Sequence, residues 1–286
     1  MDETQINLLL NEPSALRDHI RHSIQSTHWH RRISALERDE LKQASVVLFV
    51  ISNCASGSSN GFVEPCLVLN KRSSQVRQAG DLCCPGGGLN WMTDNLFAKF
   101  LRFPGAPLGS RHIWRFIQKD NSIRQKNLRA NLSILLTAGL REAWEEMRLN
   151  PLRFTFLGVL PEQPLVMFRR VIHPVVGWAS PQSYTPNWEV ERVVSITLRN
   201  LLNPSRYGRF LPVAASGHKT DGHSLQHNSF PCYIHDGQRG RELLWGATYR
   251  IALKFLELVF DFNPPAGNSL PVIERQLDEA YMNGSR

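Results

Sequence analysis

The sequence lacks the long apolar run that a membrane-spanning helix requires. Its longest apolar run, ASVVLFVIS, is far shorter than the roughly 20 residues that cross a bilayer. The N-terminus, MDETQINLLLNEPS, begins acidic and has no basic stretch before an apolar core, so we expect no signal peptide. Both observations predict a cytoplasmic protein without a transmembrane segment.

Cysteine is also scarce, with five residues in 286, at positions 54, 66, 83, 84 and 232. The number is odd and no two cysteines have the C-x-x-C spacing of many zinc sites, so we predict reduced, buried thiols. Internal repeats and long low-complexity stretches are absent as well. The content of 42% apolar and 20% charged residues is typical of a globular chain.

Basic residues outnumber acidic ones and give a net charge of +8. This charge favours an anionic partner, but by itself it leaves nucleic acid, phosphorylated metabolites and membrane lipid open. Eight Lys/Arg and only two acids lie in residues 91–130, where NLFAKFLRFPG and RHIWRFIQK mix cations with aromatic side chains. We interpret this segment either as a substrate-side lid that attracts an anion or as a helical hairpin packed on the sheet with a solvated basic rim.

The apolar pattern indicates strands, a helix, more strands and a final helix. Residues 1–42 have helical character, and the runs SVVLFVIS and PCLVLNKR read as two paired strands. Further strands are expected at FTFLGVLPEQ, VIHPVVGWAS and ERVVSITL, and a long helix at ELLWGATYRIALKFLELVF. This order predicts an α/β (α+β) protein with a mixed sheet covered by helices.

The helix between the two groups of strands, GLREAWEEMRLNP, carries a cluster of acids. Glu142, Glu145 and Glu146 fall at positions i, i+3 and i+4, so their carboxylates share one helix face. A cation would offset their repulsion, and hard oxygen ligands suit Mg²⁺ or Mn²⁺. Arg141 can brace Glu145 one turn away. The alternative is a solvated acidic face paired with nearby Lys/Arg. The opposite, apolar stripe is predicted at Leu140, Ala143, Trp144 and Met147.

The run PGGG at 85–88 follows the apolar DLCC and reads as a strand that ends in a tight turn, where backbone groups approach a metal or a phosphate. Together, this turn and the acidic helix resemble the Nudix box, G-x5-E-x7-R-E-U-x-E-E-x-G-U, where U is a bulky apolar residue. The positions that match its second half are Arg141, Glu142, Ala143, Glu145, Glu146 and Leu149.

The preceding segment, LVLNKRSSQVRQAGDLCCPGGG, resembles the coenzyme A pyrophosphatase branch of the Nudix hydrolases. The matching positions are Arg72, Ser73, Arg77, Gly80, Pro85, Gly86 and Gly87. PNWEVERVV and LLWGATYRIA resemble later segments of that branch. The resemblance covers residues 43–262 and implies a Nudix fold with a mixed β-sheet sandwiched between helices. Residues 1–42 would be an N-terminal helical extension, residues 91–130 a basic helical insertion inside the box, and residues 263–286 a C-terminal tail.

The chain departs from the box in two places. The separation of Gly87 and Arg141 is about 40 residues longer than the motif, so the first glutamate of the box has two candidate counterparts, Thr93 and Asp94. Arg148 replaces the glycine that would end the helix. We therefore expect the helix to end one residue later than in the motif, at Asn150–Pro151.

The resemblance implies a metal-dependent Nudix hydrolase that uses Mg²⁺ or Mn²⁺ to split coenzyme A or an acyl-CoA into 4′-phosphopantetheine and adenosine 3′,5′-bisphosphate. Glu145 and Glu146, with the carbonyl of Gly86, would hold the first metal, while Glu142 would bind a second metal or act as the base. Arg141 would support this catalytic set, and Glu189 is a further candidate ligand or base. The substrate would be bound by Arg72, Arg77, Gly86 and Gly87.

Two alternatives stay open. One is a Nudix hydrolase of another nucleoside diphosphate derivative, such as NADH, ADP-ribose or a sugar nucleotide. The other is a non-catalytic nucleotide-binding or nucleic-acid-binding Nudix module. Loss of Glu145 or Glu146 would have favoured the binding module, and because both are present we favour a hydrolase of a small anionic substrate. The oligomeric state is open, with a homodimer as one alternative.

Overall fold

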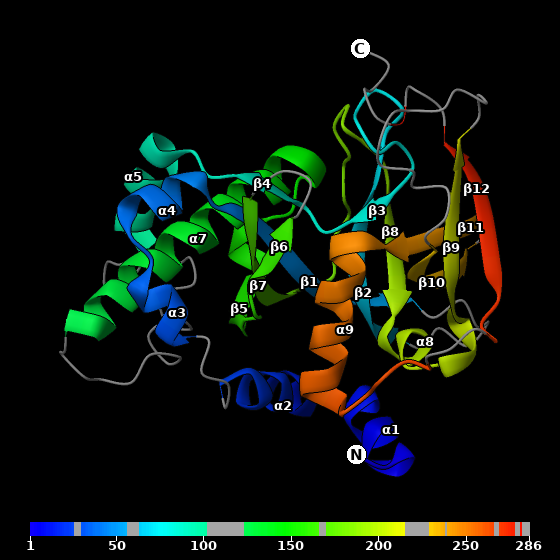
Figure 1. Ribbon diagram of the computed structural model, residues 1–286. Helices are drawn as coiled ribbons and strands as arrows, with labels where there is room; N and C mark the ends of the chain where they lie inside the picture. Colours follow the sequence, from blue (N-terminus) through cyan, green and yellow to red (C-terminus); the bar gives the residue numbers. More distant parts are fainter. Residues whose placement is uncertain are drawn as a thin grey trace.

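The computed structural model describes residues 1–25, 30–55, 63–101, 123–165, 170–214, 229–237, 239–265, 269–277 and 281. In these ranges the chain forms a mixed α/β fold with one eight-stranded sheet and one four-stranded sheet (Figure 1). The predicted fold class, a mixed sheet between helices, is confirmed. No helix in the described ranges is long and apolar enough to cross a membrane.

The large sheet has the order β3-β2-β1-β7-β5, in which β4 also pairs with β1, β6 with β7 and β8 with β2. The pair β1–β7 is parallel and the other pairs are antiparallel. The predicted pairing of the first two strands is confirmed. The strands are β1 (Ser45–Ala55), β2 (Val63–Arg72), β3 (Leu82–Cys83), β4 (Gly86–Gly88), β5 (Phe154–Val159), β6 (Gln163–Leu165), β7 (Arg170–Ala179) and β8 (Val190–Thr197).

The small sheet has the order β11-β10-β9-β12, with β12 parallel to β9. Its strands are β9 (Tyr207–Ala214), β10 (Phe230–Gly237), β11 (Gly240–Trp245) and β12 (Val272–Leu277). The prediction that the last long helix begins at Glu242 was wrong. Residues 242–245 belong to β11, because their backbone pairs with β10, and the helix begins only at Gly246.

The helices are α1 (Glu3–Asn11), α2 (Pro13–Gln25), α3 (His30–Ala35), α4 (Arg38–Gln43), α5 (Trp91–Leu101), α7 (Ile123–Met147), α8 (Leu198–Leu201) and α9 (Gly246–Phe260), with short 3₁₀ turns η1 (Pro151–Arg153) and η3 (Pro204–Arg206). The predicted helical character of residues 1–42 is confirmed by α1–α4. Within the predicted insertion 91–130, α5 and the first turns of α7 are helical, and residues 102–122 lie outside the described residues.

Helices cover both faces of the large sheet because side chains of β1 alternate between two apolar clusters. Phe49 and Ile51 face α2 and α9, and the ring of Phe49 lies 4.7 Å from that of Phe255 on α9. Leu48 and Val50 belong to the other cluster, together with residues of α3, α5 and α7. Figure 1 shows helices on both sides of the large sheet. Each fully buried side chain of this size stabilises the fold by about 1.5–3 kcal/mol. Strand β1 therefore contributes side chains to the apolar clusters on both faces of the large sheet.

The end of α7 differs from the prediction. The helix ends at Met147 rather than at Asn150, and Arg148 takes a left-handed φ of 57°. The amide of Leu149 donates to the carbonyl of Ala143, and the Leu149 side chain is fully buried. Burial of Leu149 offsets the cost of the left-handed residue, which is about 1–2 kcal/mol.

The predicted apolar stripe of α7 is confirmed at three of its four positions. Leu140, Ala143 and Met147 are buried. Trp144 is 45% exposed instead, and the Arg148 guanidinium lies 5.3 Å from the centre of its ring. Its position at the border of the stripe places the indole outside the core.

Gly139 brings α7 close to β1 just before the acidic turns begin. A Cβ atom at Gly139 would lie 2.6 Å from Cδ2 of Leu48, a fully buried side chain. The absence of a side chain at this position thus sets the distance between the helix and the sheet, and with it the height of the glutamates above β4.

Gly139→Ala should destabilise the protein although alanine is the better helix former. The propensity gain is about 1 kcal/mol, whereas overpacking a core costs about 1–3 kcal/mol. In a Leu48→Ala background the clash is gone, so the same substitution should then stabilise. Denaturant unfolding of the four proteins measures both effects, and a destabilisation of equal size in both backgrounds would contradict the role of this contact.

Candidate active site

The last turns of α7 lie directly over the glycine strand β4. The amide of Gly86 donates to Oε2 of Glu146 at 3.3 Å. A Cβ atom at Gly87 would lie 2.6 Å from the carboxyl carbon of Glu142. The predicted tight turn at PGGG is in fact a short strand, because Gly86–Gly88 pairs with Ser45–Val47 of β1. Glycine is required at Gly86, where a Cβ atom would clash with the Val46 carbonyl oxygen of β1, and at Gly87 it leaves room for the Glu142 carboxyl.

Glu146 is the most perturbed carboxyl of this cluster. Burial, the charge of Glu142 and the charge of Glu189 together raise its pKa to about 8, while the amide of Gly86 and the side chain of Asn70 act in the opposite direction. Asn70 Nδ2 donates to Glu146 Oε2 at 2.8 Å. Two neutral donors therefore face a site that holds several negative charges.

Glu142 and Glu189 complete the acidic cluster around Glu146. Burial raises the pKa of Glu142, and Arg141 opposes this shift through an ion pair of 3.0 Å between Nη1 and Oε1. Glu189 lies in the turn before β8, which is tied to α7 because the amide of Asn187 donates to the Glu146 carbonyl at 2.8 Å. The structure thus brings the predicted residue Glu189 close enough to α7 for its charge to raise the pKa of Glu146.

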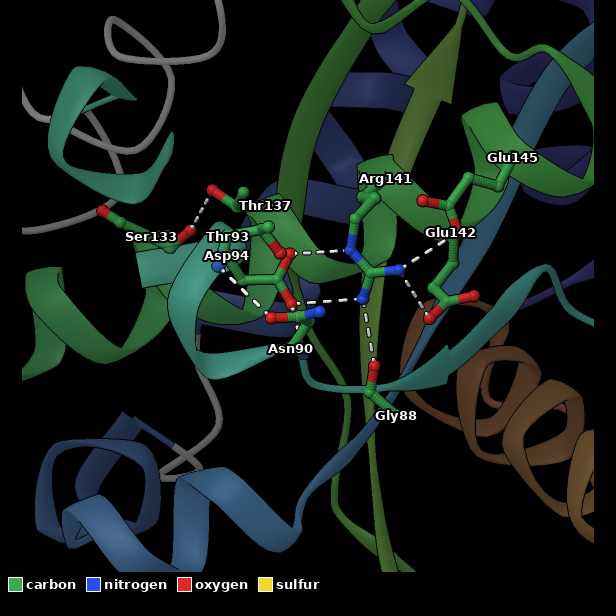
Figure 2. A network of polar contacts seen from close by, with 9 residues as sticks. All are labelled: Gly88, Asn90, Thr93, Asp94, Ser133, Thr137, Arg141, Glu142 and Glu145. Carbon is green, nitrogen blue, oxygen red and sulfur yellow. Dashed lines mark hydrogen bonds and ion pairs between the residues drawn. The ribbon is translucent and has the colours of Figure 1, made fainter. Parts of the chain in front are cut away.

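Arg141 is the hub of a second network, shown in Figure 2. Its Nε donates to Asp94 Oδ1 at 2.8 Å and its Nη2 to Asp94 Oδ2 at 3.2 Å. Nη2 also donates to the Gly88 carbonyl at 3.0 Å, and Nη1 to Glu145 Oε2 at 3.1 Å. The Asp94 hydrogen bond is the main reason why the pKa of Arg141 is raised. The predicted bracing of Glu145 by Arg141 is confirmed.

Asp94, rather than Thr93, is the acid that α5 contributes to this network. Its side chain is fully buried and also accepts a hydrogen bond from the Asn90 amide at 2.7 Å. Thr93 is exposed, and its amide donates to the Asn90 side chain. The contact with Arg141 is made by Asp94, which lies inside the predicted insertion, and not by Thr93.

The three glutamates of α7 have different surroundings. Glu142 and Glu146 point to β4, whereas the Glu145 side chain is 51% exposed and bonded to Arg141. Among the described residues, no group of three or more His, Cys, Asp or Glu side chains is gathered closely enough to be recognised as a metal site. The predicted three-carboxylate face is therefore split into a half-buried pair and one outer residue.

The predicted substrate-binding arginines lie at the end of β2 (Arg72) and in the short loop that follows it (Arg77). Arg72 Nε donates to the Arg77 carbonyl at 2.7 Å, and the Arg77 side chain is exposed. Ser73 joins this loop to the Glu189 turn, because its amide donates to the Glu189 carbonyl at 2.9 Å and its hydroxyl to the Trp188 carbonyl at 2.7 Å. The arginine loop and the candidate base are thus parts of one assembly.

Asn70 is a site residue that the sequence analysis missed. It is fully buried on β2, donates to Glu146, and its Oδ1 atom has no hydrogen-bond partner in the described part of the chain. The signal was present, since Asn70 directly follows the apolar run CLVL on the same strand. A buried polar residue in such a run indicates a partner that only the fold reveals.

Comparisons with known proteins found no matching family model and no matching curated sequence. Solved structures that align with the chain include a Nudix hydrolase from M. smegmatis, RenU, with 13% identity, a TM-score of 0.33, and coverage of 56% of this chain and 73% of that one. A MutT/nudix family protein from Enterococcus faecalis aligns with 12% identity, a TM-score of 0.36, and coverage of 82% and 67%. These TM-scores are too low to assign an activity, so the functional argument rests on the residues of this chain.

Replacing Glu146 by Gln should stabilise the metal-free protein at pH 8. A carboxyl whose pKa rises on folding, from 4.5 to about 8, favours the folded state most below pH 4.5 and loses that contribution as the pH rises toward 8. Removing the charge should therefore raise the unfolding free energy by an amount on the order of 1 kcal/mol or more. Thermal unfolding in a chelating buffer at pH 5 and pH 8 measures this difference.

Glu145→Gln is the matched control, since Glu145 is half exposed and already paired with Arg141. This substitution should not raise the unfolding free energy at pH 8. An equal increase of the unfolding free energy in both variants would show that Glu146 is not in a crowded acidic environment.

Asp94→Ala should destabilise the protein by roughly 3 kcal/mol, since it removes one partner of a buried ion pair. Thr93→Ala, at the exposed neighbouring position, should change stability by less than about 0.5 kcal/mol. Denaturant unfolding compares the two variants. A small effect of Asp94→Ala would mean that Glu142 and Glu145 suffice to hold Arg141 in place.

Proposed function

We propose that the protein is a metal-dependent Nudix hydrolase that cleaves a pyrophosphate bond. The observation that carries this proposal is the placement of Glu142 and Glu146 over the glycine strand, with Glu189 close enough to perturb the pKa of Glu146. A half-buried cluster of acids without a matching cation costs stability, and a function that needs the charge is the physical reason to keep it.

The donor chemistry of the cluster fits a hard divalent cation, Mg²⁺ or Mn²⁺. Glu142, Glu146 and Glu189 offer carboxylate oxygens, and the carbonyl of Gly86 lies in the strand beneath them. Glu145 would join this set after exchanging its bond with Arg141. When bound, such a cation supplies charge neutralisation on the pyrophosphate oxygens and a lower pKa of the attacking water.

The protein side chains would divide the remaining work. Glu189 forms no ion pair within the described ranges, so its carboxylate is free to accept a proton from water. Arg141 holds Glu142 and Glu145 in place through its own contact with Asp94. Arg72 and Arg77 belong to the segment that Ser73 joins to the Glu189 turn, where their positive charge would bind phosphate oxygens.

The segment that links the arginine loop to PGGG supports coenzyme A or an acyl-CoA as the substrate. R-S-x-x-x-R and P-G-G carry the resemblance to the coenzyme A pyrophosphatase branch, and within P-G-G the amide of Gly86 donates to Glu146. Cleavage would release 4′-phosphopantetheine and adenosine 3′,5′-bisphosphate. NADH, ADP-ribose and sugar nucleotides are the alternative substrates, and a non-catalytic nucleotide-binding or nucleic-acid-binding module is the alternative class.

A substrate panel tests this proposal. Coenzyme A, acetyl-CoA, NADH and ADP-ribose are incubated with the protein and Mg²⁺ or Mn²⁺, and the products are identified by chromatography and mass spectrometry. We expect metal-dependent release of adenosine 3′,5′-bisphosphate from coenzyme A, and a loss of at least about 100-fold in kcat for Glu146→Gln, since a metal-bound carboxylate has no neutral substitute.

If the protein hydrolyses ADP-ribose or NADH but leaves coenzyme A intact, the substrate assignment is contradicted. The proposal that the protein is a hydrolase would still stand. Binding of coenzyme A without hydrolysis, with the same affinity in wild type and Glu146→Gln, would favour the binding module.

A further inference from the structure

The C-terminal end of the described chain contacts the arginine loop. The Tyr281 hydroxyl donates to Asp81 Oδ2 at 2.7 Å, and the Tyr281 carbonyl accepts from the Gln78 amide at 2.6 Å. Tyr281 is 6% exposed and Asp81 8% exposed, so these bonds are shielded from water. Tyr281, about 200 positions downstream, thus packs against the segment that contains Arg72 and Arg77.

Strand β12 makes a second contact with the same loop. Arg275 Nη2 donates to the Ala79 carbonyl at 2.9 Å, and Nη1 lies 3.4 Å from Asp81 Oδ1. A Cβ atom at Gly80 would lie 2.6 Å from Arg275 Nη2, and Gly80 also has a φ of +78°. The guanidinium therefore packs against a backbone position whose conformation and lack of space favour glycine.

Hydrogen bonds within the loop connect these contacts to Arg72 and Arg77. The Arg72 amide donates to the Asp81 carbonyl at 3.0 Å, and the Gly80 amide donates to the Arg72 carbonyl at 2.9 Å. Arg72 Nε in turn binds the Arg77 carbonyl. A displacement of residues 78–81 would therefore move both arginines.

The loop is thus held from two sides. On one side Ser73 binds the Trp188–Glu189 turn, and on the other side Asp81 and Gln78 bind the C-terminal segment. Strand β12 is itself anchored by its parallel pairing with β9 in the small sheet. The small sheet, which lies beside the large one (Figure 1), therefore has a path of contacts to the candidate active site.

We propose that β12 and Tyr281 form a latch that positions the Arg72–Arg77 loop for a substrate with adjacent phosphate groups. Tyr281, Asp81 and Arg275 are positioning residues, since they act through the loop rather than on the substrate. The link to substrate rests on the proposed function, whereas the latch contacts do not. A loop held in its binding conformation loses less entropy when the anion binds, so the latch lowers KM and leaves kcat to the acids of α7.

Tyr281→Phe tests the latch because it removes one hydroxyl and retains the ring. Tyr207→Phe is the matched control, because it also removes one buried tyrosine hydroxyl. The Tyr207 hydroxyl donates to the Leu201 carbonyl at 2.6 Å rather than to residues 73–81. Hydrogen–deuterium exchange of residues 73–81 is measured for both variants and for Arg275→Ala. We expect exchange in this loop to be about 10-fold faster in Tyr281→Phe and Arg275→Ala, as the loss of a hydrogen bond to a charged group predicts, and unchanged in Tyr207→Phe.

Steady-state kinetics on the best substrate of the panel then separates positioning from general stability. Tyr281→Phe should raise KM about 10-fold and change kcat less than twofold, and a parallel fall of kcat in all three variants would overturn the latch. Unchanged loop exchange in Tyr281→Phe and Arg275→Ala would overturn it as well.

If the wild type hydrolyses no substrate of the panel, the proposed function fails while the exchange measurement still decides the latch. The affinity for inorganic pyrophosphate, measured by calorimetry, then replaces KM. Faster loop exchange with unchanged pyrophosphate affinity would show that the loop does not bind phosphates and would overturn the positioning role.

Discussion

The close approach of α7 to the glycine strand is the constraint on which the candidate site depends. Gly139 lets the helix lie against Leu48 of β1, and Gly87 leaves room for the Glu142 carboxyl above β4. A Cβ atom at Gly139 would clash with the Leu48 side chain, and one at Gly87 would clash with the Glu142 carboxyl. The close approach removes Glu146 from water, and desolvation is the main reason why its pKa rises to about 8.

Arg141 determines which acidic side chains of the site have a cationic partner. A guanidinium has several donors in a fixed plane, so one residue can bind Asp94 on one edge and still reach Glu142 and Glu145 on the other (Figure 2). Glu146 lies beyond the reach of these bonds and receives only neutral donors from Gly86 and Asn70. The helix therefore carries one compensated outer acid and an inner pair whose charge is only partly offset, which is the electrostatic condition for attracting a cation.

The local parts of the fold and of the site were predictable from the sequence, because periodicity and spacing depend on neighbouring residues. The hairpin β1–β2, the helical N-terminus and the bridge from Arg141 to Glu145 are of this kind. Contacts between distant segments were not predictable. Nothing near Asp94 indicates its partner Arg141, and the run at 243–245 fits a helix or a strand until β10 lies beside it. Likewise, only the buried site of Leu149 explains why α7 ends at Met147.

Segments remote in sequence from the acidic turns of α7 hold both flanks of the candidate site. Helix α5, which begins the predicted insertion, places the acid Asp94 against Arg141 and so ties this segment to α7. The C-terminal segment holds the arginine loop from the other direction through Asp81. Each flank of the acidic cluster is thus fixed by an ion pair or a hydrogen bond to a remote segment. Since hydrogen bonds in a network reinforce one another, both remote segments help to hold the surroundings of the α7 acids in one arrangement.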